Sequence, residues 1–351
     1  MMHVANRQAL LNHFQLDFDR ILPAFPLPEL ERHRIFVTGG TGFIGYWLLL
    51  ACHWLNKRGA GIQLTLLSRS PERFLSAHPE CRDFSWIEWI KGDIKDYVAP
   101  TGHFDAFIHG AADTSPAAAR SLELFDDITI GTQHVIDHAV AAGARRLLLI
   151  SSGAVYGEQP GTLTSLPEDF PGLNLPLNPD DAYGRGKRMM EDCALSATQA
   201  HPIEPIIARC FSFVGYGLPG HLAASQFIDD ALHNDRLQIT GDGRAIRSYL
   251  HAADLAVWLL ALLARGKSKQ AYNVGSPIPV SLHEVATLTR NTLAPEATIE
   301  ILNRCTSAAR QRYVPDTRRI MQELKVDCWT SLKQGIVATA TAQKLSHQST
   351  A

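Results

Sequence analysis

Cysteine is scarce in this chain of 351 residues, and its six cysteines never form a Cys-x-x-Cys pair. The paired spacings that hold zinc or mark a disulfide framework are therefore missing. Several of these cysteines stand inside apolar runs, where a reduced, buried thiol is the simplest interpretation. The six are Cys52, Cys81, Cys193, Cys210, Cys305 and Cys328. This usage favours a reducing compartment, and we expect a cytoplasmic protein.

The chain also lacks an excess of charge of either sign. Its 33 Lys and Arg residues are balanced by 35 Asp and Glu residues, for a formal net charge of -2. Such a balance argues against a broad basic surface for nucleic acid. We therefore expect small-molecule partners and no nucleic acid.

Long hydrophobic runs are missing as well. The apolar stretch at 256–264 suits a core helix and is too short to cross a bilayer. The first residues do not combine a basic region with an apolar segment, so they do not resemble a secretory signal. We expect no membrane partner.

Two motifs of other enzyme classes are absent. The 15 histidines include no His-Glu-x-x-His, and His283-Glu284 opens a predicted helix, so we expect no metal site. No Gly-x-Ser-x-Gly elbow occurs, which argues against a hydrolase.

What the chain does have is a glycine-rich turn between a strand and a helix. Residues 35–37 suit a buried parallel strand, and Gly39, Gly42 and Gly45 follow at the spacing of a dinucleotide-binding turn. The helix that begins near Phe43 would direct its first N–H groups at a pyrophosphate. A second strand at 63–67 completes the expected βαβ unit.

Strand and helix patterns alternate from residue 34 to about 150. Strands made of nearly continuous apolar residues, each followed by a helix, predict a parallel sheet covered on both faces. The expected fold is α/β, a Rossmann-type doubly wound parallel sheet with a smaller α/β substrate-binding lobe. Ligands bind at the carboxyl ends of such strands. The expected segments are an N-terminal helical extension (1–33), a dinucleotide-binding domain (34–205), a substrate lobe (206–335), some strands of which are free to return to the main domain, and a flexible tail (336–351).

A second constellation lies at the start of a predicted helix. Tyr183 and Lys187 are four residues apart, so a helix places both on one face. A nearby ammonium favours the phenolate, so we expect Lys187 to lower the pKa of Tyr183 towards a range useful for acid–base chemistry. Ser151 and Ser152 end the fifth strand about thirty residues earlier and supply hydroxyls at the same edge of the sheet.

With these motifs in family order, the chain resembles the extended short-chain dehydrogenase/reductases, in particular the nucleotide-sugar epimerase/dehydratase branch. The resemblance covers most of residues 34 to 330. Its motifs are Thr38-Gly-Gly-Thr-Gly-Phe-Ile-Gly, Gly92-Asp-Ile, His109-Gly-Ala-Ala, Ser151-Ser-Gly-Ala-Val-Tyr-Gly, Tyr183 with Lys187, and Arg247-Ser-Tyr-Leu-His-Ala-Ala-Asp-Leu-Ala.

The resemblance implies a role for each matching residue. Tyr183 would be the general acid/base, Lys187 would hold the nicotinamide ribose, and Ser152 would bind the reacting sugar oxygen. The implied cofactor-binding residues are Gly39, Thr41, Gly42, Phe43, Ile44, Gly45, Ser68, Arg69, Asp93, Ile94, Ala111, Ala112, Tyr183 and Lys187. The implied substrate-binding residues are Thr114, Ser152, Ser212, Arg247 and Arg312, with Arg310 and Arg318 as alternatives to Arg312.

Departures from the family pattern refine these expectations. NAD-dependent members carry an acidic residue at the end of the second strand, where this chain has Ser68 and Arg69, so NADP(H) is favoured over NAD(H). Dehydratases carry an Asp-Glu pair where this chain has Gly153 and Ala154, which disfavours a 4,6-dehydratase.

Two family asparagines are also replaced, by Ile128 and Ser212. The first replacement puts local backbone support or a proton relay in doubt, and the second alters contact with the substrate.

The leading hypothesis is an NAD(P)-dependent enzyme that transfers a hydride at C4 of a nucleotide-activated sugar, as a 4-epimerase or a 4-keto reductase. The alternatives are an NADPH-dependent reductase of a non-nucleotide ketone and a non-catalytic cofactor-sensing protein on the same fold. Family resemblance further implies a homodimer formed through helices near 120–142 and 181–200.

Overall fold

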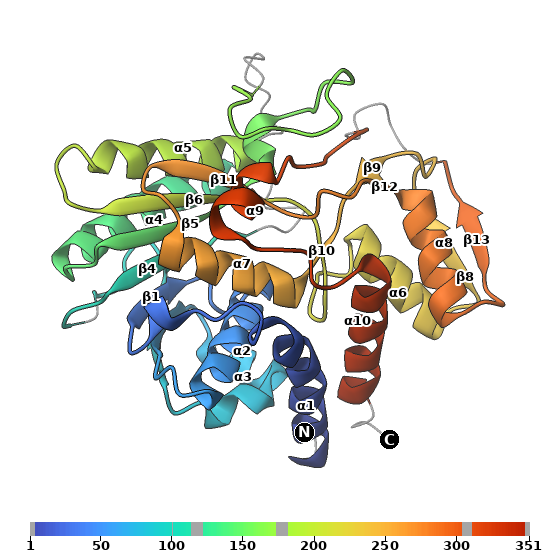
Figure 1. Ribbon diagram of the computed structural model, residues 1–351, viewed down its shortest axis with the longest axis horizontal. Coiled ribbons are helices and arrows are strands. Elements are labelled where there is room, and N and C mark those ends of the chain that lie inside the picture. The colour runs from blue at the N-terminus through green and yellow to red at the C-terminus, as the bar shows by residue number, and fades with distance from the viewer. Residues whose placement is uncertain (1–3, 100, 114–121, 173–181, 304–310, 348–351) are drawn as a thin grey trace.

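The computed structural model describes residues 4–99, 101–113, 122–172, 182–303 and 311–347. Its centre is a seven-stranded sheet in the order β11-β6-β5-β4-β1-β2-β3, in which every neighbouring pair is parallel (Figure 1). The strands are β1 (Arg34–Thr38), β2 (Gln63–Ser68), β3 (Ile87–Lys91), β4 (Ala106–His109), β5 (Arg146–Ser152), β6 (Glu204–Cys210) and β11 (Gln270–Val274). This order reverses between β1 and β4 and confirms the expected Rossmann-type fold.

Helices cover both faces of this sheet, as the continuous apolar strands require. Ile35 and Val37 of β1 belong to the core on one face, whereas Phe36 between them belongs to the core on the other. Figure 1 shows the two layers, with α4 and α5 on one side and α2 and α7 on the other. The main helices are α2 (Phe43–Lys57), α3 (Pro71–Ala77), α4 (Leu122–Ala141), α5 (Ala182–Ala197), α7 (Ala252–Arg265) and α9 (Arg318–Leu324), with short 3-10 turns η1 (Pro28–Leu30), η2 (Pro79–Asp83) and η4 (Gly153–Tyr156).

A smaller lobe lies beside the sheet and has its own apolar core, which includes Phe227, Ile228 and Val285. Its elements are α6 (Ala223–His233), β8 (Arg236–Ile239), β9 (Ile246–Arg247), β12 (Val280–Ser281), α8 (Leu282–Leu293), β13 (Thr298–Ile301) and α10 (Leu332–His347). The two-residue strands β7 (Phe213–Val214) and β10 (Leu250–His251) pair in parallel. The predicted boundary at residue 205 falls inside β6, and β11 from the predicted lobe returns to the main sheet beside it.

The two ends of the described chain lie against each other. Helix α1 (Val4–Ile21) packs beside α10, and Figure 1 shows both at the same side of the molecule. The prediction of a flexible tail is wrong for residues 336–347, because they form the rest of α10 and bury Ile336, Ala340 and Ala342. The small residues of this segment are typical of a disordered tail, but in the structure they allow α10 to pack closely on the rest of the protein.

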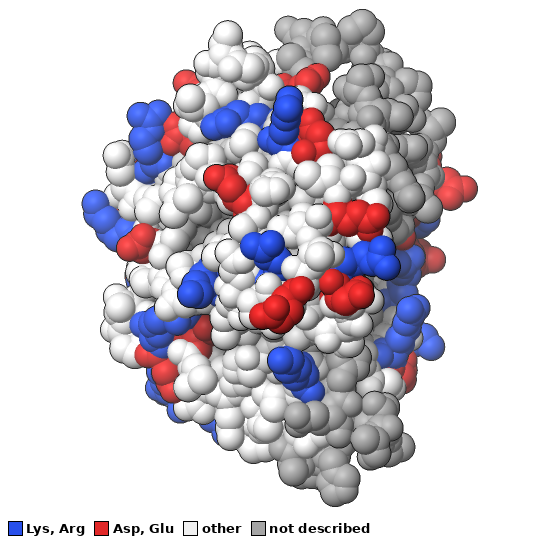
Figure 2. Space-filling model, turned by 90° about the vertical axis from the view of Figure 1, so that its right-hand side faces the viewer, with Lys and Arg blue, Asp and Glu red and all other residues white. Residues whose placement is uncertain are grey.

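Charges of both signs are interspersed over the face shown in Figure 2. No helix in the described ranges is long and apolar enough to span a membrane. Five cysteines, Cys52, Cys81, Cys193, Cys210 and Cys328, carry free thiols.

Candidate functional site

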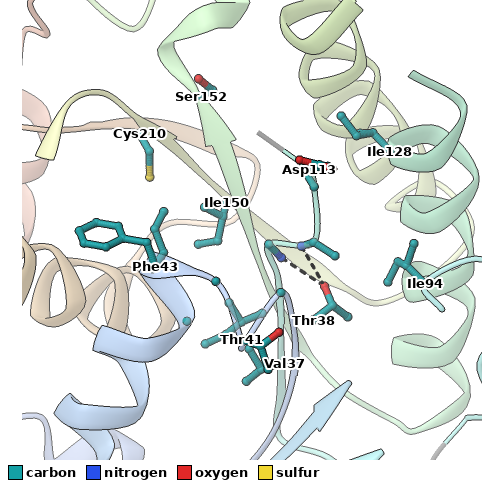
Figure 3. Close-up of a pocket in the computed structure, with 18 of the residues that line it drawn as sticks. Val37, Thr38, Thr41, Phe43, Ile94, Asp113, Ile128, Ile150, Ser152 and Cys210 are labelled. Atoms are coloured by element: carbon teal, nitrogen blue, oxygen red, sulfur yellow. Dashed lines mark hydrogen bonds between the residues drawn. The ribbon is translucent and has the colours of Figure 1, made fainter. Parts of the chain in front are cut away.

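A cavity of about 600 Å³ opens at the carboxyl ends of the central strands. Every residue that the sequence assigned to catalysis or to cofactor binding lines it. In Figure 3, Phe43 and Cys210 border one side of the cavity and Ile94 and Ile128 the other. The structure therefore brings these segments together, while the individual roles stay predictions.

The glycine turn fits closely under this cavity. Gly39 has a φ of +74°, and a Cβ there would lie 2.6 Å from the carbonyl carbon of Gly110. A Cβ on Gly45 would lie 2.4 Å from the backbone of Gly40, so α2 can pack this closely on the turn only because residue 45 has no side chain. The N-cap residue of α2 is Gly42, which has no side chain to accept a hydrogen bond from the first N–H groups of the helix. These N–H groups can therefore bind an anionic ligand. A backbone cradle of this kind fits the pyrophosphate of a dinucleotide.

A buried hydroxyl–imidazole chain holds the neighbouring turn in place. The Thr132 hydroxyl donates to the carbonyl oxygen of Ile128 (2.6 Å), so it accepts from Nε2 of His109 (3.1 Å). Nδ1 of His109 then accepts from the Thr38 hydroxyl (2.8 Å). Burial, followed by the positive charge of Lys187, lowers the pKa of His109 to about 3. The imidazole is therefore neutral, as both of its hydrogen bonds require.

The same Thr38 oxygen accepts hydrogen bonds from the backbone N–H groups of Gly110 and Ala111, at 3.2 and 3.3 Å (Figure 3). These bonds shape the turn after β4 that lines the cavity. The sequence did not indicate that Thr38, His109 and Thr132 form this hydrogen-bonded chain. The one available signal was that Thr38 and His109 stand at the ends of adjacent parallel strands.

The end of β2 has no carboxylate. The Ser68 hydroxyl contacts the Thr41 hydroxyl at 3.3 Å and accepts from the backbone N–H of Ser70 at 3.2 Å. Arg69 lies at the cavity edge with an exposed side chain, and it has no salt bridge within the part of the chain that the structure describes. This corner presents a hydroxyl and a cation to whatever binds there.

The turn after β3 is fixed by its own backbone. Asp93 accepts from the N–H of Lys95 at 3.1 Å, while the side chain of Ile94 packs on α4. Gly131 makes this packing possible, because a Cβ there would lie 2.7 Å from Cγ1 of Ile94. Asp93 and Ile94 thus meet the cavity from one short turn.

Tyr183, Lys187 and Ser152 also line the cavity. Nζ of Lys187 lies 5.9 Å from the centre of the Tyr183 ring and donates to the carbonyl oxygen of Ile150 at 2.8 Å. Burial lowers the pKa of Lys187 to about 8. Burial also raises the pKa of Tyr183 well above its usual value, and the hydrogen bond with Ser152 opposes that rise.

The expected lowering of the Tyr183 pKa is therefore not what the structure gives. The four-residue spacing places both side chains on one face of α5, but the ammonium points at a strand carbonyl rather than at the phenol oxygen. Removal from water then dominates the pKa of Tyr183, because it disfavours the charged phenolate.

A buried ion pair anchors the strand end that carries Ser152. Arg209 makes two hydrogen bonds to Glu191, at 3.0 and 2.7 Å, and Glu191 also accepts from the Ser151 hydroxyl at 2.5 Å. Arg209 donates further to the hydroxyl of Tyr156 at 2.9 Å. The charges of this network satisfy one another in a region without water access. The sequence pattern did not indicate it.

Two aromatic rings fill the space beside Gly153. The rings of Phe211 and Tyr313 stack with centroids 4.5 Å apart. A Cβ on Gly153 would lie 2.5 Å from the Tyr313 hydroxyl and 2.8 Å from Cζ of Phe211. The structure therefore leaves no room for a side chain at Gly153, one of the two positions at which the family resemblance implies an acidic pair in dehydratases.

The other side of the cavity has an apolar wall. Phe43 and Phe213 stack with ring centroids 6.4 Å apart, and the segment after β7 adds Leu218, Pro219 and Leu222. The sequence did not indicate this wall.

The predicted substrate residues other than Ser152 are not found in the described cavity lining. Thr114 and the alternative Arg310 lie outside the described residues. Ser212, Arg247 and Arg312 do not line the cavity. Arg247 donates to the carbonyl oxygen of Ile246 at 2.8 Å, and Arg312 donates to that of Thr164 at 2.9 Å.

The alternative Arg318 forms a salt bridge with Asp316 at 2.5 Å. No cluster of three potential metal ligands occurs within the described ranges.

Comparison with known proteins agrees with this geometry. The model of the NAD dependent epimerase/dehydratase family matches residues 35–275. UDP-glucuronic acid decarboxylase 1 of Danio rerio is 27% identical over 355 residues, which cover 96% of this chain and 80% of the relative.

Two solved structures share the fold. TunA, an NAD-dependent NDP-hexosamine 5,6-dehydratase of tunicamycin biosynthesis, has a TM-score of 0.75 at 21% identity, covering 89% of this chain and 98% of its own. A UDP-glucose 4-epimerase of Thermotoga maritima, solved with UDP-glucose, has a TM-score of 0.72 at 18% identity and covers 89% of this chain and 98% of its own. With the family model spanning well over half of the sequence, the chain belongs to the NAD-dependent epimerase/dehydratase family.

Proposed function

We propose that this protein transfers a hydride at C4 of a nucleotide-activated sugar, as a 4-epimerase or a 4-keto reductase. The observation that carries the proposal is the convergence of Tyr183, Lys187 and Ser152 on a cavity with a dinucleotide-type glycine turn. When bound, the nicotinamide supplies the hydride exchange. The protein supplies the proton, the orientation and the exclusion of water.

Tyr183 exchanges the proton of the reacting hydroxyl or carbonyl oxygen, and Ser152 holds that oxygen. A phenol whose pKa burial raises stays protonated and suits proton donation to a carbonyl oxygen, which favours the reductive direction. Lys187, with a pKa near 8, changes protonation close to neutral pH and can pass a proton onward. The crowding at Gly153 supports a reaction without elimination of water, because no acid fits beside Ser152.

NADP(H) is the preferred cofactor in this proposal. The exposed guanidinium of Arg69 stands at the end of β2, where it can pair with a 2′-phosphate, and Ser68 brings no negative charge to repel that phosphate. Dissociation constants for NADPH and NADH, measured by tryptophan-to-nicotinamide energy transfer, test the preference. Tighter binding of NADH would contradict it.

The decisive experiment combines purified protein, NADPH or NAD, and a panel of nucleotide sugars and their 4-keto forms. Stoichiometric consumption of NADPH with a 4-keto sugar indicates a reductase, and sugar conversion without net cofactor change indicates an epimerase. Tyr183→Phe should lower kcat by about a hundredfold or more, as expected for loss of a general acid. Unchanged turnover in this variant would refute the assignment, and turnover of neutral ketones alone would favour the non-nucleotide reductase.

A second candidate is decarboxylation of a nucleotide-activated uronic acid. It is supported by the similarity to UDP-glucuronic acid decarboxylases and by the same crowding at Gly153. Oxidation at C4 of a uronic acid places the carboxylate carried by C5 β to a ketone. The bond from C5 to the carboxylate carbon then breaks as CO₂ leaves, and its electron pair forms an enolate across C4 and C5. C5 takes up a proton from solvent, and return of the hydride to C4 restores the cofactor. Release of CO₂ from UDP-glucuronic acid, with no net change in the cofactor, would establish this activity over the first.

Assembly as a cytoplasmic homodimer completes the proposal. Ile130 of α4 and Met189 of α5 are large apolar side chains that are exposed in the single chain. A cavity of about 290 Å³ is lined by residues of these two helices and of the turn after α5. Burial of both helices against a second copy would cover these groups. Sedimentation equilibrium at micromolar concentration should give twice the chain mass, and a monomer would contradict the assembly.

A further inference from the structure

Helix α1 lies outside the region that matches the family model, yet it is tightly built into the protein. Its apolar side buries Leu10, Phe14, Phe18 and Ile21 almost completely. The Nε2 atom of His13 lies 2.8 Å from the carbonyl oxygen of Ala338 in α10. The helix is therefore a fixed part of the described fold.

The last turn of α1 is held by polar contacts as well. Arg20 pairs with Asp17 at 2.8 Å and donates to the Thr330 hydroxyl at 2.7 Å. Thr330 in turn donates to buried Asp254 of α7, through its hydroxyl at 2.8 Å and its backbone N–H at 2.9 Å. These contacts fix the position of α1 relative to α7 and to the segment before α10.

Phe14 connects this helix to the binding cavity. Its ring lies 5.2 Å from that of Trp47 in α2 and 5.7 Å from that of Tyr216. The indole N–H of Trp47 donates to the carbonyl oxygen of Tyr216 at 3.0 Å. Phe14 thus packs against both partners of the bond that ties the segment after β7 to α2.

Tyr216 belongs to the segment that forms the apolar wall. We call residues 215–222 the wall segment, because Leu218, Pro219 and Leu222 line the cavity. The wall segment begins close to α7 and α2 because residue 215 is a glycine: a Cβ on Gly215 would lie 2.4 Å from the Cβ of Ala252. A shift of Tyr216 would therefore move the wall segment, and with it the part of the cavity that Leu218, Pro219 and Leu222 line.

We infer that α1 is a positioning element of the binding site, in which Phe14 holds the wall segment through Tyr216 and Trp47. The inference rests on the proposed function only for the identity of the substrate. Phe14 touches neither the substrate nor the cofactor, so it is expected to change binding rather than the chemical step. Loosening of the wall should weaken substrate binding and leave proton transfer by Tyr183 intact.

The test uses Phe14→Leu and Phe14→Ala in the full chain, with Phe25→Leu as the matched control. Phe25 is buried in the same apolar core but packs on Trp329 and Arg265, away from the wall segment. Hydrogen exchange of residues 216–222, measured without ligand, should become faster in both Phe14 variants and stay unchanged in the control. Equal exchange in all four proteins would overturn the inference, whatever the substrate is.

The second readout is steady-state kinetics with the nucleotide sugar that the wild type turns over. Phe14→Leu should raise KM by about fivefold and leave kcat within about twofold, the pattern expected when ground-state and transition-state binding are lost together. The same rise in Phe25→Leu, or a fall in kcat with unchanged KM, would refute the positioning role. A wild type that turns over no nucleotide sugar would refute the proposed function, while the exchange result would still decide the role of α1.

Discussion

Replacement of Lys187 by methionine should make the protein more stable at neutral pH while it removes a residue of the proposed site. The side chain of Lys187 is 2% exposed, and no salt bridge to it occurs in the described parts of the chain. Burial lowers its pKa from 10.5 to about 8. That difference corresponds to about 3 kcal/mol against the charged form in the folded state.

Methionine has nearly the same length and carries no charge, so the variant escapes this penalty. It also loses the hydrogen bond to the carbonyl oxygen of Ile150, which is worth about 1 kcal/mol. The free energy of unfolding should therefore rise by about 2 kcal/mol at pH 7.

The gain should depend on pH in a defined direction. The folded-state pKa lies below the unfolded one, so the unfolded chain binds the extra proton between about pH 8 and 10.5, and wild-type stability rises across that window. The advantage of Lys187→Met is therefore full below pH 8, shrinks above it and reverses near pH 10.5. Urea unfolding of both proteins at pH 7, 9 and 10.5 measures the difference. A variant that is less stable at pH 7, or a difference that does not change with pH, would refute the reasoning.

Three further changes test the crowding at Gly153, the end of β2, and the contact of α7 with Thr330. Gly153→Ala should lower kcat/KM by about tenfold or more, because the new Cβ would lie 2.5 Å from the Tyr313 hydroxyl oxygen. Adding Tyr313→Phe, which removes that oxygen, should restore part of the loss. An unchanged kcat/KM in Gly153→Ala would show that Phe211 and Tyr313 can move aside. Arg69→Glu should weaken NADPH binding by about tenfold or more and spare NADH, in a titration of each cofactor, whereas equal losses would place Arg69 away from the 2′-position. Burial raises the pKa of Asp254 from 3.8 to about 7, so its ionisation costs stability as the pH rises from about 4 to 7. Asp254→Asn should flatten that part of the stability profile. The control Thr330→Val removes the hydroxyl that donates to Asp254 and accepts from Arg20 but keeps the carboxyl group, so it should keep the slope. An unchanged slope in Asp254→Asn would contradict the assignment.

Local sequence rules predicted that the glycine turn and the ends of β2, β3 and β4 would meet at one cavity, because the geometry of these segments depends on backbone conformation. Gly39 is required by a positive φ and by the close approach of Gly110, and a glycine-rich turn between an apolar strand and a helix is the sequence signal for both requirements. The carboxyl ends of parallel strands meet at one edge of the sheet, so Asp93 and Ala111 could be placed in the same cavity without knowledge of their contacts.

The pKa values of Tyr183 and Lys187 were less predictable. The spacing of Tyr183 and Lys187 gives a shared helix face, but it contains no information on burial or on the direction of the ammonium. Burial sets both pKa values in the structure, and it results from packing between segments that are far apart in the sequence. The crowding of Gly153 by Tyr313 has the same origin, since it joins positions 160 residues apart.

The C-terminal helix shows how composition misleads when packing decides. Ala338-Thr-Ala-Thr-Ala has the small, polar look of a disordered segment. In the structure, small residues are what the contact needs: a Cβ on Gly335 would lie 2.9 Å from Val214, and Ala340 and Ala342 are buried. The partner surfaces come from β7 and from α1, which no local rule connects with this segment.

The two buried cations beside the cavity, Arg209 and Lys187, differ in the direction of their pKa shifts. Arg209 is bound by both oxygens of Glu191, and this pairing raises its pKa to well above the usual value, so it stays charged and fixes the end of β5. Lys187 of α5 donates to a backbone carbonyl of β5, that of Ile150, and burial lowers its pKa to about 8. A carboxylate beside Lys187 would stabilise the fold but would also hold the proton on the ammonium. The cavity is thus lined by Ser152, at the strand end that the Arg209–Glu191 pair fixes, and by Lys187, which has no salt bridge in the described structure. A fixed hydroxyl and a group that titrates near neutral pH are what the proposed proton transfer at Tyr183 would use.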